Sequence, residues 1–278
     1  MSIPINYTFI RHSNSMGNSL SSMISNKIVT VNEANHLVDN VLIDPSLSQV
    51  GQHASIINGK VIADILKKQN IKYVNVVCCS TLIRSMLSVY YLTRKWEISP
   101  KKIFVLPHLR EIDEGSNDKW SKESMENVDL ISSYRMKPLI EQKKVLQKLG
   151  IIDMFDFSFV EKSEYLRHSL GDIPNFINWT KQNILDKVFQ KSVIPTSYHF
   201  YVITHAGVLS DYTQLSFPNN TGIIVKGIYY LRTNELDILK FINLRPLLEE
   251  NGNFVDSYND KKSVNTNAPA FKKLLQMH

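Results

Sequence analysis

The chain has 278 residues, 43% hydrophobic and 21% charged, which is ordinary globular composition and enough sequence to bury a sizeable core. Its net charge of +6 at pH 7 favours anionic partners, and a small phosphorylated molecule meets that description as well as nucleic acid does. The apolar runs are all shorter than the roughly 18 residues of a membrane span, and residues 1–10 lack a signal-peptide pattern. We therefore expect a soluble cytoplasmic protein with no membrane partner. The two cysteines, Cys78 and Cys79, are adjacent, which excludes a disulfide framework and indicates buried reduced thiols.

The first predicted element is a short buried strand at residues 7–10, which ends in Arg11 and His12. Open α/β sheets bind their ligands outside the carboxyl ends of their strands. At that edge an arginine offers a fixed cation, and a histidine offers a nucleophile or an acid–base group. We therefore hypothesise that His12 attacks a phosphoryl group that Arg11 helps to hold. The alternative is a surface loop that contains both residues by chance.

A helix is predicted next, with Ser48 as its N-cap and apolar residues at helical spacing up to residue 66. Gly51 and Gly59 interrupt its pattern, and we interpret Gly51 as a point of close packing against a neighbouring backbone. A β-branched strand follows at residues 73–78, and a second helix begins near residue 82.

Arg84 falls in the first turn of that second helix, where the helix dipole disfavours a cation. An arginine in this place makes sense when an anion lies in front of the helix. The alternative is an exposed arginine that reaches solvent.

Residues 103–106 form another predicted strand, and an acidic loop at residues 109–115 comes directly after it. From about 116 to 197 helical patterns dominate, around residues 136–149 and 176–189. We expect a helical insertion between two sheet strands here, without strands of its own. A central strand at residues 198–204 then ends in His205, a strand nearer the sheet edge follows at 222–231, and residues 251–278 form a polar tail.

Reactive or charged groups therefore follow four predicted strands, at Arg11–His12, Arg84, Glu111 and His205. In a mainly parallel sheet such strand ends meet at one edge. Arginines and histidines that converge there suit a dianionic phosphate. A carboxyl group beside them supplies a proton for a leaving alcohol.

These segments resemble the phosphoglycerate-mutase-like histidine phosphatases. The opening signature of that family is Arg-His-Gly, with Ser or Thr two places on and Asn three places after that. The matching residues in this chain are Arg11, His12, Ser13, Ser15 and Asn18, with serine in place of the glycine.

Four further segments follow in the family's order, so that the resemblance spans residues 7–230. An Asp, Leu, Ser/Thr, Gly segment resembles Asp44, Leu47, Ser48 and Gly51. The small residues before the family's second arginine resemble residues 80–84. The family's Leu-x-Glu followed by Gly resembles Leu109, Glu111 and Gly115, and its closing His-[Gly/Ala]-Gly resembles residues 205–207. Each segment is weak alone, whereas five in order are a strong signal.

The resemblance implies a role for each matching residue. His12 would be the nucleophile that becomes phosphohistidine, and Glu111 would be the proton donor. The phosphoryl oxygens would be held by Arg11, Asn18, Arg84 and His205. No metal or other cofactor is implied, because the two arginines and His205 would neutralise the phosphate charge. The remaining histidines lack metal-ligand spacing and are interpreted as structural or surface residues: His36, His53, His108, His168 and His199.

Three local questions stay open in the sequence. Ser13 replaces a glycine that would permit a special backbone torsion or a close approach, which puts catalytic efficiency in doubt. Asn18 is also typical of an ordinary helix N-cap. Asp113 and Glu114 lie in the same loop as Glu111, and Glu114 is the alternative proton donor.

We therefore predict a single α/β domain over residues 1–250, a three-layer sandwich with a mainly parallel central sheet and a helical insertion over the active site. The predicted function is a metal-independent phosphatase that acts on a small phosphorylated metabolite. A phosphoglycerate-type mutase is the nearest alternative, although residues 112–115 differ from the mutases' Arg-His-Tyr-Gly continuation. A non-catalytic phospho-ligand binding protein is the second, and nucleic-acid binding ranks below both. The sequence names neither the substrate nor the oligomeric state.

Overall fold

The structure is a computed structural model that describes residues 1–30, 32–33, 44–96, 102–112, 137–161, 171–190 and 194–256. Asp113 and Glu114, part of the predicted 116–197 insertion and most of the 251–278 tail lie outside the described residues. No helix in the described ranges has the length and apolar character needed to cross a bilayer.

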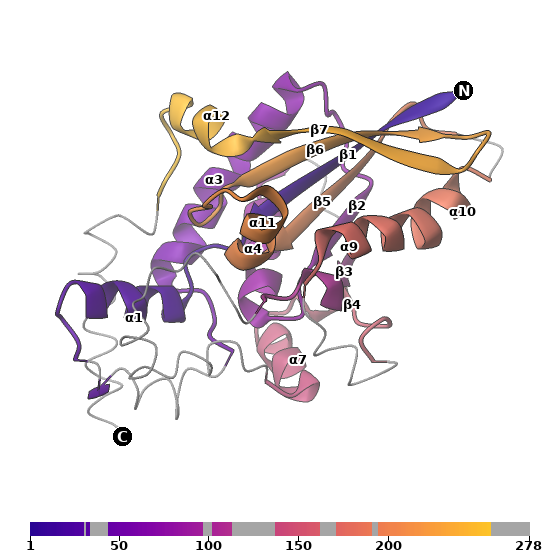
Figure 1. The fold of residues 1–278 in the computed structure, drawn as a ribbon. Coiled ribbons are helices and arrows are strands. Elements are labelled where there is room, and N and C mark those ends of the chain that lie inside the picture. Colours follow the sequence, from indigo (N-terminus) through magenta and orange to yellow (C-terminus); the bar gives the residue numbers. More distant parts are fainter. Residues whose placement is uncertain are drawn as a thin grey trace.

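One mixed sheet forms the centre of the molecule (Figure 1). Its strands are β1 (Ser2–Arg11), β2 (Val76–Cys79), β3 (Ile103–Val105), β4 (Phe155–Asp156), β5 (Tyr198–Thr204), β6 (Gly222–Tyr230) and β7 (Glu235–Asn243). They lie in the order β4-β3-β2-β5-β1-β6-β7. The pairs from β4 to β1 are all parallel, and only the β1–β6 and β6–β7 pairs are antiparallel. The predicted mainly parallel α/β sheet is therefore confirmed.

Helices cover both faces of this sheet. They are α1 (Met16–Ser25), α3 (Gln49–Lys68), α4 (Ile83–Thr93), the short 3₁₀ helices η1 (Pro107–Leu109) and η2 (Ile152–Met154), α7 (Leu139–Lys148), α9 (Ile173–Thr180), η3 (Lys181–Leu185), α10 (Asp186–Val188), α11 (Ala206–Thr213) and α12 (Leu244–Glu250). Ile62 of α3, Met86 of α4 and Leu248 of α12 belong to one buried apolar cluster. Phe176 of α9 and Leu209 of α11 belong to a second. Successive residues of the central strands belong alternately to the two clusters, which therefore lie on opposite faces of the sheet. The molecule thus has the predicted three layers.

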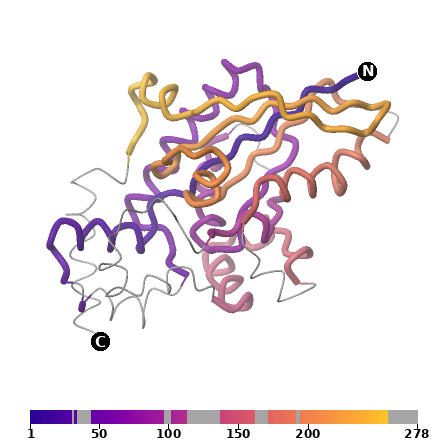
Figure 2. Tube along the Cα trace, viewed as in Figure 1, coloured from indigo at the N-terminus to yellow at the C-terminus, as the bar shows by residue number. Residues whose placement is uncertain are grey.

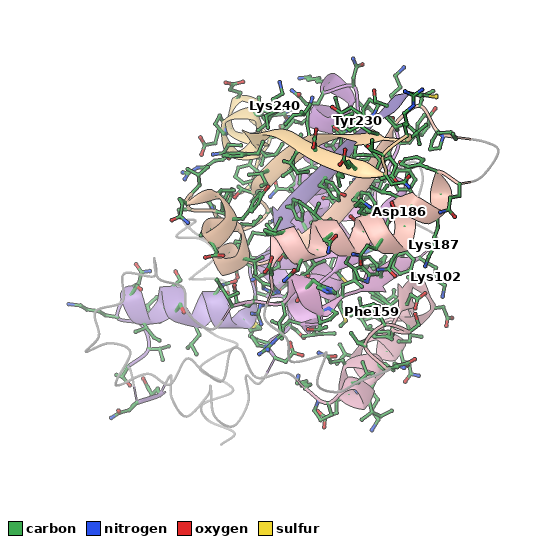
Figure 3. The ribbon with its side chains drawn as sticks, turned by 45° about the vertical axis from the view of Figure 1, so that its right-hand side comes forward. Lys102, Phe159, Asp186, Lys187, Tyr230 and Lys240 are labelled. Atoms are coloured by element: carbon green, nitrogen blue, oxygen red, sulfur yellow. The ribbon has the colours of Figure 1, made fainter. Side chains whose placement is uncertain are left out.

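The continuous rod of α9, η3 and α10 crosses the second face of the sheet, with Asp186 labelled toward its end (Figure 3). Asp186 accepts a 2.6 Å hydrogen bond from the Tyr229 hydroxyl of β6. Nearer the middle of the rod, the Tyr7 hydroxyl of β1 lies 2.8 Å from Thr180 Oγ1. The rod is thereby tied to the two neighbouring strands β1 and β6, which run side by side in Figure 2 although they are far apart in sequence.

Strand register brings the predicted site residues to one edge of the sheet. Arg11, the last residue of β1, pairs with Thr204, the last residue of β5. On the other side of β5, Cys79 of β2 pairs with Ile203. The residues that follow these three strands, His12, His205 and Ser80, therefore leave the sheet next to one another, as parallel strands require.

Two details differ from the sequence prediction. The segment expected to be purely helical also contributes β4, which pairs with Ile103 and Phe104 at the sheet edge. Two residues are too few to produce a readable strand period. The strand β7 was not predicted either, and it lies outside β6 as the other edge of the sheet. Cys78 and Cys79 are both buried and unpaired, as expected.

Candidate active site

His12 lies at the carboxyl end of β1 with only 3% of its surface exposed. Its ring Nδ1 lies 2.7 Å from the backbone oxygen of Ser13. A carbonyl oxygen can only accept, so Nδ1 carries the proton and Nε2 carries the lone pair. Arg84 donates from Nε to that Nε2 over 3.3 Å. The ring is thus fixed in the tautomer that a nucleophilic imidazole requires.

Arg84 reaches His12 from the first turn of α4, and it is only 4% exposed. The first backbone nitrogen of α4, that of Ile83, donates to the buried carboxylate of Asp44 over 3.0 Å. An acidic group at this place interacts favourably with the helix dipole. Arg84 is therefore not the exposed arginine that reaches solvent, which was the alternative interpretation of the sequence. Burial, Arg84 and Arg11, in that order, hold the pKa of His12 well below its ordinary value of 6.5, so the imidazole is neutral near pH 7.

His205 follows β5 and occupies the position before α11. Its ring centroid lies 4.9 Å from that of His12. Its Nε2 lies 2.8 Å from the hydroxyl of Ser80, and this hydroxyl also accepts from the backbone nitrogen of Leu82 over 3.3 Å. Burial first, and then Arg84, His12, Arg11 and Arg110, lower the pKa of His205 well below its ordinary value.

Glu111 is the second residue after η1 and is 8% exposed. One carboxylate oxygen, Oε1, accepts from the backbone nitrogen of Ile112 over 3.2 Å, and the other, Oε2, lies 3.8 Å from His205 Nδ1. Burial raises the pKa of Glu111 to about 7, although the nearby Arg84 and Arg11 pull it down. A carboxyl group with this pKa is poised to exchange a proton near neutral pH.

Gly207 explains how Glu111 comes so close to the start of α11. A Cβ atom at position 207 would lie 2.6 Å from Glu111 Oε1. The glycine of the predicted His-Ala-Gly segment therefore makes room for the carboxyl group beside His205.

Arg11 and Asn18 complete the predicted set. Arg11 donates from Nη1 to the backbone oxygen of Phe217 over 2.6 Å, and its charge acts on both His12 and Glu111. Asn18 is not the N-cap of α1 but the third residue of the helix. It exchanges hydrogen bonds with the N-cap Ser15 in a capping box. The Asn18 side chain takes part in this box through its Oδ1, which accepts from Ser15 N and Ser15 Oγ.

Ser13 fits its position without strain. It is not among the residues with a positive φ, so no glycine torsion is required. Its hydroxyl donates to the Gly51 backbone oxygen over 2.7 Å and accepts from Asn220 Nδ2 over 3.0 Å. Gly51 is a point of close packing, as predicted, because a Cβ there would lie 2.0 Å from the Asn14 backbone oxygen.

The structure therefore brings all the predicted site residues to one edge of the sheet. Glu114, the alternative proton donor, lies outside the described residues. Sequence reasoning missed four residues that support the set: Ser80, Arg110, Asn219 and Asn220. The segment containing Ser80 carried a signal because it resembled a family motif, whereas the two asparagines lie outside every segment that resembles the family.

Chemically, this arrangement offers a neutral imidazole lone pair, buried arginine cations and a protonatable carboxyl group in one place. Within the described part of the chain, no group of three or more His, Cys, Asp or Glu side chains is arranged to hold a metal ion. The cations make the site suited to an anionic ligand with several oxygens.

No family model matches the chain, and no curated protein matches it. Among solved structures, the protein histidine phosphatase SixA in complex with tungstate is 11% identical, with a TM-score of 0.36 over 88% of this chain and 99% of that chain. A mycobacterial glucosyl-3-phosphoglycerate phosphatase is 9% identical, with a TM-score of 0.38 over 86% and 97% of the two chains. The alpha-ribazole phosphatase of Shigella flexneri is 10% identical, with a TM-score of 0.38 over 86% and 96%. At such identities and TM-scores, we base the function on the geometry of the site itself.

Proposed function

We propose that this chain is a member of the histidine phosphatase superfamily and hydrolyses phosphomonoesters through a phosphohistidine at His12. The observation that carries the proposal is the state of the His12 ring. Its Nδ1 is held by the Ser13 carbonyl, and its Nε2 lone pair faces the guanidinium of Arg84. A nucleophile placed beside a cation that can bind the phosphoryl oxygens is what phosphoryl transfer requires.

In the first step, His12 Nε2 attacks the phosphorus atom, and the bond from phosphorus to the ester oxygen breaks. Glu111 gives its proton to the departing oxygen, which leaves as an alcohol. The pKa of Glu111, raised to about 7 by burial, supports this role because the carboxyl group is largely protonated below neutral pH. The products of this step are phosphohistidine and the Glu111 carboxylate.

In the second step, a water molecule attacks the phosphorus atom of the phosphohistidine. The Glu111 carboxylate takes a proton from this water, and the bond between phosphorus and Nε2 breaks. The products are inorganic phosphate, the free His12 ring and a protonated Glu111, so the site returns to its starting state. The same residue thus serves as acid and then as base.

Arg11, Arg84, Asn18 and His205 hold the phosphoryl oxygens in this proposal. Ser80 accepts from the Leu82 nitrogen and can donate its own proton to His205 Nε2. We therefore assign the ring proton of His205 to Nδ1, where it can be donated to a phosphoryl oxygen. The two arginines neutralise the charge that Mg²⁺ neutralises in other phosphoryl-transfer sites, so the proposed reaction needs no metal.

The test is turnover of an aryl phosphate in excess EDTA, with a His12→Ala variant as the comparison. Chelator-resistant turnover that disappears in the variant supports the proposal. Equal inactivity of both proteins, together with protection from thermal unfolding by inorganic phosphate, would favour the binding protein. Transfer of a phosphoryl group between positions of phosphoglycerate, dependent on a bisphosphorylated primer, would favour the mutase.

A further inference from the structure

A turn at residues 217–221, between α11 and β6, contacts each of the residues 11–13 that carry the proposed nucleophile. Two of its contacts are backbone hydrogen bonds. Arg11 donates from its backbone nitrogen to Thr221 O over 2.8 Å, and Asn220 donates from its backbone nitrogen to Arg11 O over 3.2 Å. A third contact joins the Arg11 guanidinium to Phe217 O over 2.6 Å. These contacts fix the turn against the end of β1.

Two asparagine side chains of the turn reach the next two residues of the chain. Asn219 donates from Nδ2 to the His12 backbone oxygen over 2.8 Å, and the same Nδ2 lies 3.4 Å from Asn18 Oδ1. Asn220 donates from Nδ2 to the Ser13 hydroxyl over 3.0 Å. The 217–221 turn therefore holds all three residues 11–13, and its asparagine side chains hold His12 and Ser13.

Both asparagine side chains are fully buried, and the Oδ1 atom of each has no hydrogen-bond partner among the described residues. A buried polar atom without a partner lowers stability, because it has lost its hydrogen bonds to water and gained none in return. Two adjacent residues that carry this cost are poor choices for stability alone. The hydrogen bonds from their Nδ2 atoms to residues 12 and 13 give these side chains a role that a smaller or apolar residue would not fill.

The backbone of the turn presents both side chains in the required direction. Thr221 closes the turn by donating from its backbone nitrogen to Pro218 O over 3.2 Å and from its hydroxyl over 2.6 Å. Asn220 has a φ of 59°, in the left-handed region that asparagine tolerates better than most residues. Gly222, the first residue after the turn, lies where a Cβ has no room, since that atom would lie 1.8 Å from Phe9 O.

We propose that Asn219 and Asn220 are positioning residues for the His12 nucleophile, an inference that rests on the proposed function. The Ser13 carbonyl sets the His12 tautomer, and Ser13 is itself fixed by Gly51 O, Ser88 Oγ and Asn220 Nδ2. Asn219 fixes the His12 carbonyl, which belongs to the same peptide unit as the Ser13 nitrogen that donates to Ser88 Oγ. Asn219 and Asn220 together thus hold the backbone that sets the orientation of the His12 ring, with its Nε2 toward Arg84.

The test uses Asn219→Ala and Asn220→Gly in the full chain. Glycine accepts the positive φ at position 220, so this variant removes the amide without straining the turn. A small misplacement of a reacting group can cost about 10²-fold in rate, and we expect kcat and the rate of His12 phosphorylation to fall about tenfold, with KM changed less than about twofold. Asn220→Gly carries the test if Asn219→Ala does not fold.

The matched control is Asn58→Ala. Asn58 is also a fully buried asparagine, and its side chain makes two hydrogen bonds to the backbone of Val255. We expect this variant to lower the thermal midpoint with kcat per folded molecule unchanged. If the two turn variants behave like the control, with only the midpoint lowered, the positioning role is overturned.

A double-mutant cycle tests the Asn220–Ser13 contact. With Ser13→Gly already in place, Asn220→Gly should cost no further activity, because its partner hydroxyl is gone. Equal costs in both backgrounds would contradict the inference. The nitrogen NMR signals of the His12 ring give a readout that does not need turnover, and we expect the Nδ1-protonated pattern to weaken in both turn variants. That change in a chain that forms no phosphohistidine would overturn the proposed function while supporting the positioning of His12.

Discussion

Nε of Arg84 donates to Nε2 of His12 over 3.3 Å, so the guanidinium occupies the same lone pair that the proposed reaction uses. A phosphoryl group has to take over this hydrogen bond before His12 can attack. Arg84 is therefore expected to move from the ring nitrogen to a phosphoryl oxygen as the substrate binds. This exchange lets a cation stabilise the incoming charge without leaving a buried donor unpaired.

The first prediction concerns Arg84. Replacement by alanine should lower kcat/KM by about 10²–10³, the usual cost of losing one contact to the transition-state charge. Arg84→Lys should recover little activity, since an ammonium lacks the planar fork that binds two oxygens. Steady-state kinetics of both variants checks this. An Arg84→Lys enzyme as active as the wild type would show that only the charge matters.

The second prediction separates the acid from the nucleophile. Glu111→Gln should lower kcat/KM for an alkyl phosphate by about 10²–10⁴, the range that general acid catalysis supplies. The loss should be much smaller for a p-nitrophenyl ester, whose leaving group needs no proton. The ratio of the two losses is the measurement. If Glu114→Gln, and not Glu111→Gln, gives the selective loss, the acid has been assigned to the wrong residue.

The third prediction is the pH dependence of kcat/KM for an alkyl phosphate. Protonated Glu111 is required in the first step, so activity should fall as the pH rises through about 7. The pKa of His12 and of His205 is held well below 6.5, so neither should cause a fall in activity near that pH. In Glu111→Gln the limb near pH 7 should vanish. Its persistence would assign the limb to another group.

The fourth prediction concerns stability in acid. His12, His199 and His205 are buried, and the pKa of each is lowered, to about 3 for His199. The unfolded chain takes up protons on these residues below pH 6.5 and the folded chain does not, so the free energy of unfolding should fall as the pH drops below 6.5. Glu111, with a raised pKa, partly opposes this trend.

His199 offers a clean measurement of that effect, because its contact is with Thr8 Oγ1 at 2.8 Å and not with the site. His199→Gln should reduce the pH slope of the urea-unfolding free energy by up to about 1.4 kcal/mol per pH unit, the contribution of one titrating group. An unchanged slope would show that His199 takes up its proton in the folded state as well.

The strand ends could be predicted from the sequence because the apolar stretches near the ends of β1, β2 and β5 stop at polar residues. Arg84 was predicted from its unfavourable place in a helix start. These signals are local, and the parallel sheet converts them into one site. For β4 the local signal failed, because its two residues are too few to show a period.

The contacts that hold the site together could not be predicted in the same way. Ser80 and His205 are 125 positions apart in the chain, and Asn219 and His12 are 207 apart. A Pro-Asn-Asn sequence indicates a turn, but nothing local states what its amides will bind. Whether serine fits at position 13, where the family has glycine, likewise could not be predicted from the sequence. The partners of the Ser13 hydroxyl, Gly51 and Asn220, come from distant parts of the chain.

The most direct test of a phosphohistidine at His12 is to quench the enzyme during turnover of a ³²P-labelled substrate and locate the label. The label should survive alkali, be lost in acid and map to the peptide that contains His12. It should be absent from His12→Ala. An acid-stable label, or a label on any other residue of an active enzyme, would contradict the proposed mechanism.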